Sequence, residues 1–357
     1  SVLDDLKLRA SYGVLGNAQG IGNFQAVPAV TGARQYLGNG GQAFQIANDQ
    51  LTWERSQQLN IGISVGLLKN RIFLSADYFN NQTEDQLLAV PLPGDSGFGS
   101  ITGNVGEVLN EGLELELSVV TLDKGGFKWV TSGNISFQNN EILSLNEGQE
   151  QINPGASTRR IVGQPINVLW GVDYVGVNPA NGKAMWRDNA GNIQYGNFAP
   201  EDGRVVGSPI PDSFGGLTNT FSYKGITLDI FFQFQLGAEA FNGDLANLAA
   251  SGGRNDNQLV SQLDRWQQPG DVTNVPRAYE GEIIDGFHQA LRNDFGTFRN
   301  TRYISDASYV RLKQVNLTYS FPKSITDKLN MRSLSIFAQA TNLLTWTKFD
   351  GIDPEVI

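Results

Sequence analysis

Apolar and polar side chains alternate with a period of two through much of this chain. Residues 59–67 place Leu, Ile, Ile, Val and Leu at the odd positions and Asn, Gly, Ser and Gly at the even positions. A strand sends successive side chains to opposite faces, whereas a helix repeats about every 3.6 residues, so this pattern predicts a β-strand. The chain is therefore expected to be all-β, because the same alternation recurs in residues 6–14, 72–78, 113–119, 226–236, 310–321 and 334–340.

Strand length and one phase slip refine this prediction. Residues 226–236 keep their apolar positions in register over a segment of about eleven residues, which is the length of a tilted strand that crosses a membrane. Between Val310 and Phe321 the apolar positions change once from even to odd numbers. A β-bulge adds one residue to a strand, so a bulge near Lys313 and Gln314 would return these side chains to one face.

The connections between these segments alternate between short and long. Tight turns are expected at residues 68–70, 122–126 and 223–225, and a longer turn at 322–331, with a helical part started by Ser324 and Asp327. The long polar connections are residues 16–50, 81–110, 139–167 and 238–302. Outer-membrane barrels have short periplasmic turns and long extracellular loops, so the pattern favours an antiparallel transmembrane β-barrel, with about ten strands in this chain.

Composition excludes several classes of function. The 357 residues contain 41 Gly and 20 Phe but no Cys, and His288 is the one histidine, which leaves no thiol nucleophile, disulfide framework or common set of zinc ligands. The formal charge of -10 would repel phosphate backbones, so no nucleic-acid partner is expected. No run approaches the roughly 18 apolar residues of a transmembrane helix. Residues 1–9 lack the apolar stretch of a signal peptide, so the start is expected to be internal or processed.

Motifs that resemble reactive sites have simpler explanations. Glu114 and Glu116 share a polar strand face and are interpreted as lining of a barrel lumen instead of a catalytic pair. Residues 178–182 and 188–192 lack EF-hand spacing and are expected to be hairpin turns that flank residues 183–187. The Gly-rich stretches lack the lysine or the spacing of phosphate-binding loops. We therefore expect no enzyme activity, no cofactor and no metal.

Aromatic side chains gather at predicted strand ends and in the long loops. Those at strand ends are expected to form interfacial girdles, or only to reflect the aromatic content of strands: Trp53, Tyr78, Trp129, Trp170, Tyr223, Phe321 and Trp346. Aromatic faces suit sugar rings and arginines suit carboxylates, which gives a set of candidate substrate contacts in the loops. These are Tyr36, Phe44, Arg159, Arg160, Trp186, Tyr195 and Trp266. The alternative is that most of them pack the loops.

Several short phrases occur in the order and spacing of a known family. They are residues 10–17 (ASYGVLGN), 51–55 (LTWER), 70–79 (NRIFLSADYF), 110–114 (NEGLE), 307–313 (ASYVRLK) and 351–355 (GIDPE). Taken together, they make the chain resemble, almost end to end, the C-terminal barrel region of the SusC/RagA family of TonB-dependent outer-membrane transporters from Bacteroidota.

This resemblance implies a plugged barrel of roughly 22 strands. Residues 1–357 would be its C-terminal portion, with the N-terminal plug and the last strand absent. It also implies TonB-energised import of oligosaccharides or peptides across the outer membrane. The implied partners are a SusD-like surface lipoprotein, the TonB-ExbB-ExbD complex and outer-membrane lipid. Two alternatives stay open: a passive porin or adhesin barrel, and a soluble β-rich glycan-binding protein or enzyme.

Overall fold

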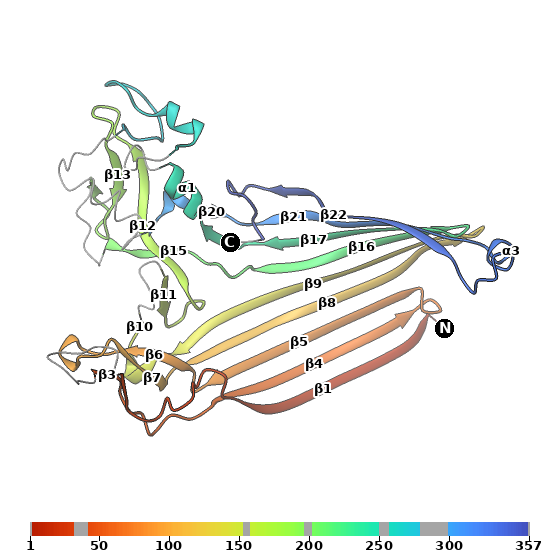
Figure 1. The fold of residues 1–357 in the computed structure, drawn as a ribbon, viewed down its shortest axis with the longest axis horizontal. Coiled ribbons are helices and arrows are strands. Elements are labelled where there is room, and N and C mark those ends of the chain that lie inside the picture. The colour runs from red at the N-terminus through yellow and green to blue at the C-terminus, as the bar shows by residue number, and fades with distance from the viewer. Residues whose placement is uncertain are drawn as a thin grey trace. The chain divides into compact units, whose positions relative to one another are not determined.

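A long sheet of nine strands is the main feature of the computed structural model (Figure 1), which describes residues 2–31, 42–152, 158–195, 202–249, 257–278 and 299–355. In hydrogen-bonded order the strands are β1 (Leu3–Asn17), β4 (Glu54–Leu67), β5 (Ile72–Glu84), β8 (Glu107–Lys124), β9 (Phe127–Ser144), β16 (Ser213–Tyr223), β17 (Ile226–Leu236), β21 (Tyr309–Ser320) and β22 (Ser335–Thr347). They have 11 to 18 residues, enough to cross a membrane at a tilt. The all-β prediction is confirmed, with nine long strands described where about ten were expected.

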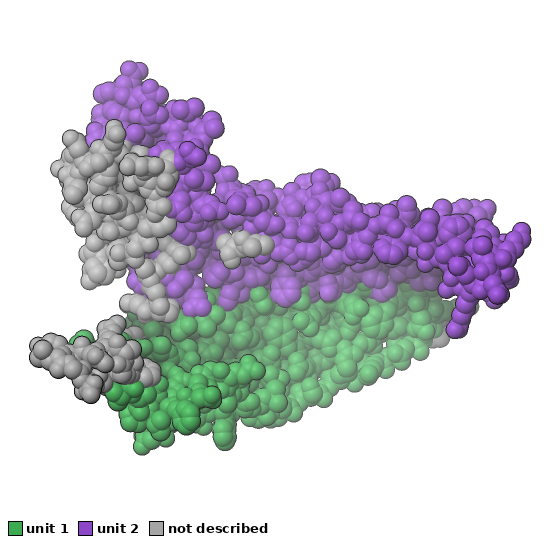
Figure 2. Space-filling view, viewed as in Figure 1, with its two compact units in different colours: residues 1–117, 136–154, 160–166 green, residues 118–135, 155–159, 167–357 purple. Residues whose placement is uncertain are grey.

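The chain forms two compact units, which Figure 2 shows in different colours. Unit 1 comprises residues 1–117, 136–154 and 160–166, and unit 2 comprises residues 118–135, 155–159 and 167–357. Within unit 1, β1 and β4 pair antiparallel and align Leu8 with Ile63. Within unit 2, β16 and β17 pair antiparallel and align Leu217 with Phe232. The alternation seen in the sequence thus becomes an apolar row on one face of the sheet.

Large apolar side chains along these strands are exposed. Leu8 is 74% exposed, Leu217 41% and Ile336 59%. An apolar surface of this extent is unfavourable in water and marks contact with a membrane or a partner. The buried hydrophobic residues gather instead where the loop elements pack, for example Leu88, Val108 and Ile142 in unit 1, or Val172, Ala184 and Trp186 in unit 2. None of the helices in the described ranges has the length and apolar character to span a membrane.

The opposite face of the sheet carries a polar network in unit 1. Arg9 on β1 reaches across Gly62 on β4 to Asp77 on β5, and its Nη2 lies 2.6 Å and 2.8 Å from the two carboxylate oxygens. The same nitrogen donates to Ser75 Oγ at 3.0 Å. A Cβ atom at position 62 would lie 1.9 Å from Asp77 Oδ1, so glycine is what lets the two charged side chains meet above β4.

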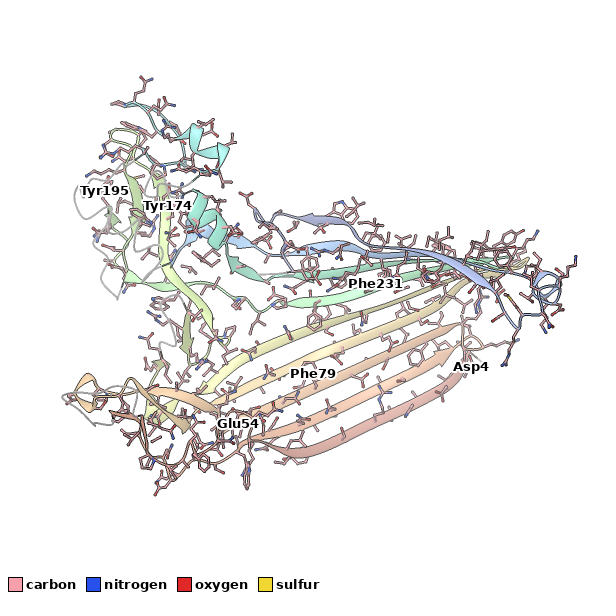
Figure 3. The ribbon with its side chains drawn as sticks, in the orientation of Figure 1. Asp4, Glu54, Phe79, Tyr174, Tyr195 and Phe231 are labelled. Carbon is pink, nitrogen blue, oxygen red and sulfur yellow. The ribbon has the colours of Figure 1, made fainter. Side chains whose placement is uncertain are left out.

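Tight turns join the long strands at one end, as predicted. Leu68, Lys69 and Asn70 all have positive φ in the turn between β4 and β5. In Figure 3, Asp4 marks this end of the strands and Glu54 the end that leads into the loops. The longer turn between β21 and β22 contains α3 (Lys323–Thr326), which follows Pro322 without a side-chain cap. Ser324 and Asp327 therefore do not start this helical turn as expected.

The long connections contain small sheets and short helices. A seven-stranded sheet combines β10 (Gln151–Ile152), β11 (Thr158–Ile161), β12 (Val168–Val177), β13 (Ala184–Arg187), β14 (Ile193–Gln194), β15 (Arg204–Gly207) and β19 (Arg299–Asn300). Three two-stranded sheets are β2 (Ala29–Thr31) with β3 (Gln42–Gln45), β6 (Leu87–Pro91) with β7 (Ser100–Asn104), and β18 (Glu239–Phe241) with β20 (Ile304–Asp306). The helices are η1 (Gly94–Ser96), η2 (Asn146–Gly148), α1 (Gly243–Leu248), η4 (Val260–Asp264) and η5 (Thr301–Tyr303).

The two expected hairpin turns that flank residues 183–187 are confirmed by the antiparallel pairs β12–β13 and β13–β14.

The predicted bulge is confirmed at Lys313. The β17 register passes from Gln314 to Leu312 without pairing Lys313, and the β22 register does the same.

The aromatic residues agree with expectation only in part. Trp129, Tyr223 and Phe321 lie near the tight turns, and Trp53 and Trp346 lie near the loop ends of β4 and β22. Tyr78 lies in the middle of β5, and Trp170 lies in β12 of the loop sheet, so these two placements were wrong.

Candidate functional site

A cavity of about 630 Å³ lies within unit 2, where several loop elements meet the end of β17. Its residues come from β11, β12, β17, β18 and α1, and from the segments before β12, β16, β18 and β21 and after β22. They are Thr158, Asn167, Leu169, Pro209, Gln235, Ala238, Glu239, Ala240, Phe241, Gly243, Ala307, Pro354 and Glu355. A cavity of this volume is in the range of small-ligand sites.

Small side chains build the inner wall of this cavity. Ala238, Ala240 and Ala307 are buried and pack together, with Phe349 against them. The chain turns into β18 at Gly237, which has φ +86 and would place a Cβ 2.3 Å from Asp212 Oδ2. Only glycine fits both the left-handed backbone and this close approach, so Gly237 determines the direction in which the chain continues from β17 into β18.

The charged residues among those that line the cavity are both carboxylates. Glu239 accepts a hydrogen bond from the backbone N–H of Ser208 at 3.1 Å. Glu355 forms ion pairs with Arg311 and Lys313 of β21, and neither of these two residues lines the cavity. Beside them the wall offers the amide of Gln235, the hydroxyl of Thr158 and the ring of Phe241. Such groups can bind hydroxyls or an amine by hydrogen bonds and an apolar ring face by stacking.

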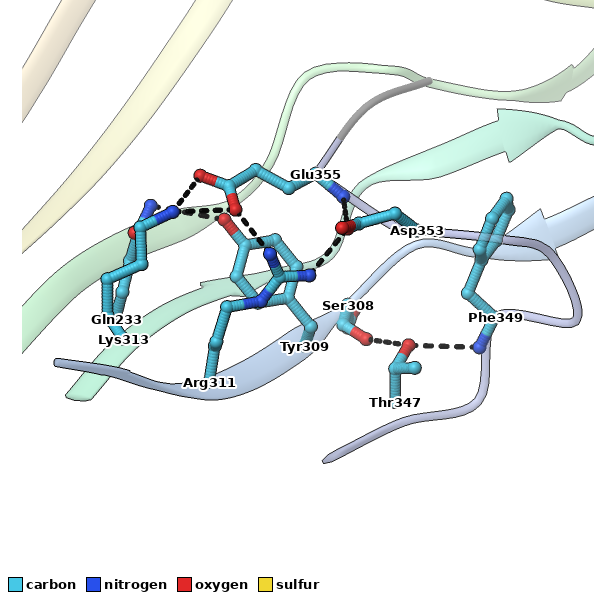
Figure 4. Close-up of polar contacts among 9 residues, drawn as sticks. All are labelled: Gln233, Ser308, Tyr309, Arg311, Lys313, Thr347, Phe349, Asp353 and Glu355. Carbon is cyan, nitrogen blue, oxygen red and sulfur yellow. Dashed lines mark hydrogen bonds and ion pairs between the residues drawn. The ribbon is translucent and has the colours of Figure 1, made fainter. Parts of the chain in front are cut away.

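Arg311, Lys313, Asp353 and Glu355 form an ionic cluster (Figure 4). Glu355 of this cluster also lines the cavity. Arg311 has 4% of its side chain exposed and lies 2.5 Å from Asp353 and 2.6 Å from Glu355. Lys313, the residue of the bulge, forms a second ion pair with Glu355, and its amino group lies 2.5 Å from the carboxylate. The hydrogen bond from Arg311 holds the pKa of Asp353 below its usual value, and the backbone N–H of Glu355 adds to this effect.

Three of the predicted contacts come together around one hairpin of the loop sheet. Trp266 donates from Nε1 to the carbonyl of Pro179 at 2.9 Å. Tyr195 accepts from the amide of Asn178 at 2.7 Å. Trp186, on the strand that follows, is 2% exposed and packs with Val172 and Ala184. The hairpin between β12 and β13 therefore gathers aromatic side chains from positions far apart in the sequence.

Tyr174 of β12 belongs to the same aromatic group and was not predicted. Its ring meets Trp186 edge to face at 6.2 Å, and its hydroxyl donates to the carbonyl of Asn274 at 2.8 Å. Figure 3 shows Tyr174 and Tyr195 in this loop region. Burial raises the pKa of Tyr174 to about 12, although Arg302 opposes the shift from 5.5 Å above the ring. The phenol therefore stays neutral under ordinary conditions.

Of the other four predicted contact residues, the structure describes the side chains of two. Arg159 of β11 lies 5.3 Å above the ring of Trp170, and burial lowers its pKa. Arg160 follows it in β11, belongs to unit 1, and also has its pKa lowered by burial. Tyr36 lies outside the described residues, and Phe44 is in β3 with a side chain outside the described part. Of the five predicted residues whose side chains the structure describes, none lines the cavity described above.

None of the residues that line the cavity was predicted from the sequence as a ligand contact. Gln235 was placed on a polar strand face and Glu355 in the phrase GIDPE, but neither was expected to contact a ligand. No sequence pattern marks Glu239 as a ligand contact, because a single carboxylate in a long polar loop cannot be told from a carboxylate that only faces solvent. Among the described residues, no group of three His, Cys, Asp or Glu is placed to hold a metal ion.

Comparison with known proteins gives consistent relatives. The family model described as TonB dependent receptor-like, beta-barrel, matches residues 1–255. TonB-dependent receptor P3 of Formosa agariphila is 32% identical over 98% of this chain and 36% of its own length. TonB-dependent receptor SusC of Bacteroides thetaiotaomicron is 27% identical over 100% of this chain and 36% of its own length.

Solved structures agree with the sequence relatives. The structure of the RagAB peptide transporter superposes with a TM-score of 0.85 at 29% identity, over 99% of this chain and 38% of that chain. The chain thus spans little more than a third of the length of these relatives. Members of this group are outer-membrane proteins, which excludes the soluble alternative. The chain belongs to the TonB-dependent receptor β-barrel family, as a relative of SusC and RagA.

Proposed function

We propose that this chain forms part of the wall of a TonB-energised importer in the outer membrane, as the SusC-like barrel of a SusCD-type complex. The observation that carries the proposal is the likeness of fold to the RagAB peptide transporter, with a TM-score of 0.85 over 99% of the chain. The exposed apolar face of the sheet suits lipid, and the cavity lies among the loop elements where a ligand from outside would arrive.

The importer takes oligosaccharides in this proposal, with peptides as the second candidate. The cavity wall offers amide, hydroxyl and aromatic groups, which suit sugar rings. The seven loop residues expected from the sequence remain proposed contacts, and the aromatic ones favour the same class. Peptides are the second candidate because RagAB is a peptide transporter by its name.

Transport in this proposal needs no chemistry from the chain. The loops and a SusD-like surface lipoprotein capture the substrate, and force from the TonB-ExbB-ExbD complex displaces a plug so that substrate can pass. The outer membrane holds no ATP, so uptake against a gradient must take its energy from the inner membrane. A passive porin would instead conduct without any such coupling.

Uptake of a labelled substrate tests the energised step. Cells that express the whole protein with its lipoprotein partner are given fluorescent neutral oligosaccharides and fluorescent peptides, with and without a protonophore. Energised import predicts that uptake stops when the proton gradient collapses. Uptake that continues unchanged would show a passive pore and would refute the proposal.

Substitution in the cavity separates the two substrate classes. Glu239→Gln removes a negative charge from a wall that has no basic lining residue in the described part of the chain. A peptide bound through an amine would lose affinity, whereas a neutral oligosaccharide would bind about as well. Asp95→Asn changes an exposed carboxylate of η1 and is the matched control, which is expected to change neither the affinity for the peptide nor that for the oligosaccharide.

A further inference from the structure

Phe24 lies at a turn in the loop that follows β1, and its side chain is 82% exposed. Its backbone has φ +61, in the left-handed region. The Cβ of an L-residue crowds the following carbonyl there, so a large aromatic residue rarely adopts this conformation. Both the exposure of the ring and the backbone conformation oppose stability, which points to a role outside folding.

Several hydrogen bonds hold the backbone of this turn. The side-chain amide of Gln45 donates to the carbonyls of Phe24 at 2.9 Å and of Val27 at 2.7 Å. The backbone N–H of Val27 also donates to the carbonyl of Phe24 at 3.1 Å. The backbone carbonyl of Phe24 is thereby held by the side chain of Gln45 in β3.

The same turn is tied to the neighbouring hairpin of unit 1. Gln25 donates from its amide to Thr102 Oγ1 at 2.5 Å, and the amide of Asn48 donates to the Thr102 carbonyl at 2.8 Å. The backbone N–H of Asn48 donates to the carbonyl of Ala26 at 3.1 Å. A loop with this many ties loses little conformational entropy when a ligand binds, so it is preorganised.

The surroundings of Phe24 indicate the chemistry of the ligand. Residues 17–31 contain no Asp, Glu, Lys, Arg or His, although the whole chain carries a net charge of -10. Asn23 and Gln19 of the same segment are exposed and offer amide groups. A flat aromatic ring beside neutral amides fits the C–H face and hydroxyls of a sugar ring.

We infer that Phe24, in the loop that follows β1, is a stacking platform for a neutral oligosaccharide, in addition to the residues that line the cavity. The inference rests on the proposed import function and adds to it a specific contact residue. Phe24 belongs to the same long loop as the candidates Tyr36 and Phe44 but was not among the residues expected from the sequence. The ring would hold substrate before any energised step.

Binding by the purified whole protein tests this inference without transport. The protein in detergent is applied to an array of neutral oligosaccharides, acidic oligosaccharides and peptides. Phe24→Gly is the main variant, because glycine adopts positive φ without strain and so keeps the turn while it removes the ring. We expect affinity for the bound neutral oligosaccharides to fall about tenfold, and Phe24→Trp to keep it.

Two further outcomes make the test decisive. Val30→Ala removes another exposed apolar side chain of the same loop, at 65% exposure, and is expected to leave binding unchanged. An equal loss in Val30→Ala and Phe24→Gly would indicate a general apolar docking surface for a protein and would overturn the inference. So would binding of peptides alone, or equal binding by Phe24→Gly and the wild type. Failure of energised uptake with binding intact would refute the import function and leave Phe24 as a glycan contact.

Discussion

The guanidinium group of Arg311 lies 2.5 Å from the carboxylate of Asp353, which fastens the segment after β22 to β21 across 42 residues of chain. The Arg311 side chain is 4% exposed, whereas that of Asp353 is 34% exposed. The cation is therefore the partner that depends on this contact, since the carboxylate can still be hydrated.

Removal of the carboxylate is expected to destabilise the protein. Asp353→Ala leaves the buried Arg311 with Glu355 as its remaining acidic partner. We expect a loss of about 2 kcal/mol in the free energy of unfolding, measured in urea, because a buried cation loses a charge-assisted hydrogen bond. Lys313→Met breaks a more exposed ion pair and is expected to cost less than about 1 kcal/mol. Equal costs would contradict the assigned burial of Arg311.

The same contact predicts a dependence of stability on pH. Arg311 and the Glu355 backbone N–H lower the pKa of Asp353 in the folded protein. A lowered folded pKa gives stability that is present above the unfolded pKa of about 3.9 and is lost as pH falls through the folded value. The wild type should therefore exceed Asp353→Asn in unfolding free energy by a constant amount from pH 5 to pH 8, and the difference should shrink below about pH 4. A difference that does not change in acid would refute this assignment.

Local patterns predicted much of the sheet. The change of phase between Val310 and Val315 located the bulge at Lys313, because a strand has a strict period of two and one extra residue must reverse it. The positions of the short turns followed for the same reason. These features depend on neighbours in sequence, and a single sequence contains that information directly.

The cavity could not be predicted in this way. Thr158, Gln235 and Glu355 all line the cavity but lie far apart in sequence, and the loops that join them have no strict period. Trp170 was expected at the end of a barrel strand, but it lies in β12. Only its pairing with β11, β13 and β15 identifies it as part of the loop sheet.

Gly62 allows a double-mutant test of the polar face. A Cβ at this position would lie 1.9 Å from Asp77 Oδ1 and 2.9 Å from Arg9 Nη2, so Gly62→Ala must separate the two charged groups. We expect a loss of about 1 kcal/mol in unfolding free energy, since this ion pair is partly exposed. In an Asp77→Ala background the same change is expected to be nearly neutral. A full loss in both backgrounds would place the effect in the backbone instead.

Adjacent residues of β16 test which face of the sheet meets lipid. Leu217 pairs with Phe232 on the apolar face, and Thr218 pairs with Phe231 on the other. Both lie near the middle of the strand, so Leu217→Arg should cost about 2–4 kcal/mol in the membrane, whereas Thr218→Arg should cost little. The measurement is unfolding of the protein in lipid vesicles, with heat-dependent gel migration as a check of folding. Equal tolerance at the two positions would mean that the apolar face does not meet lipid.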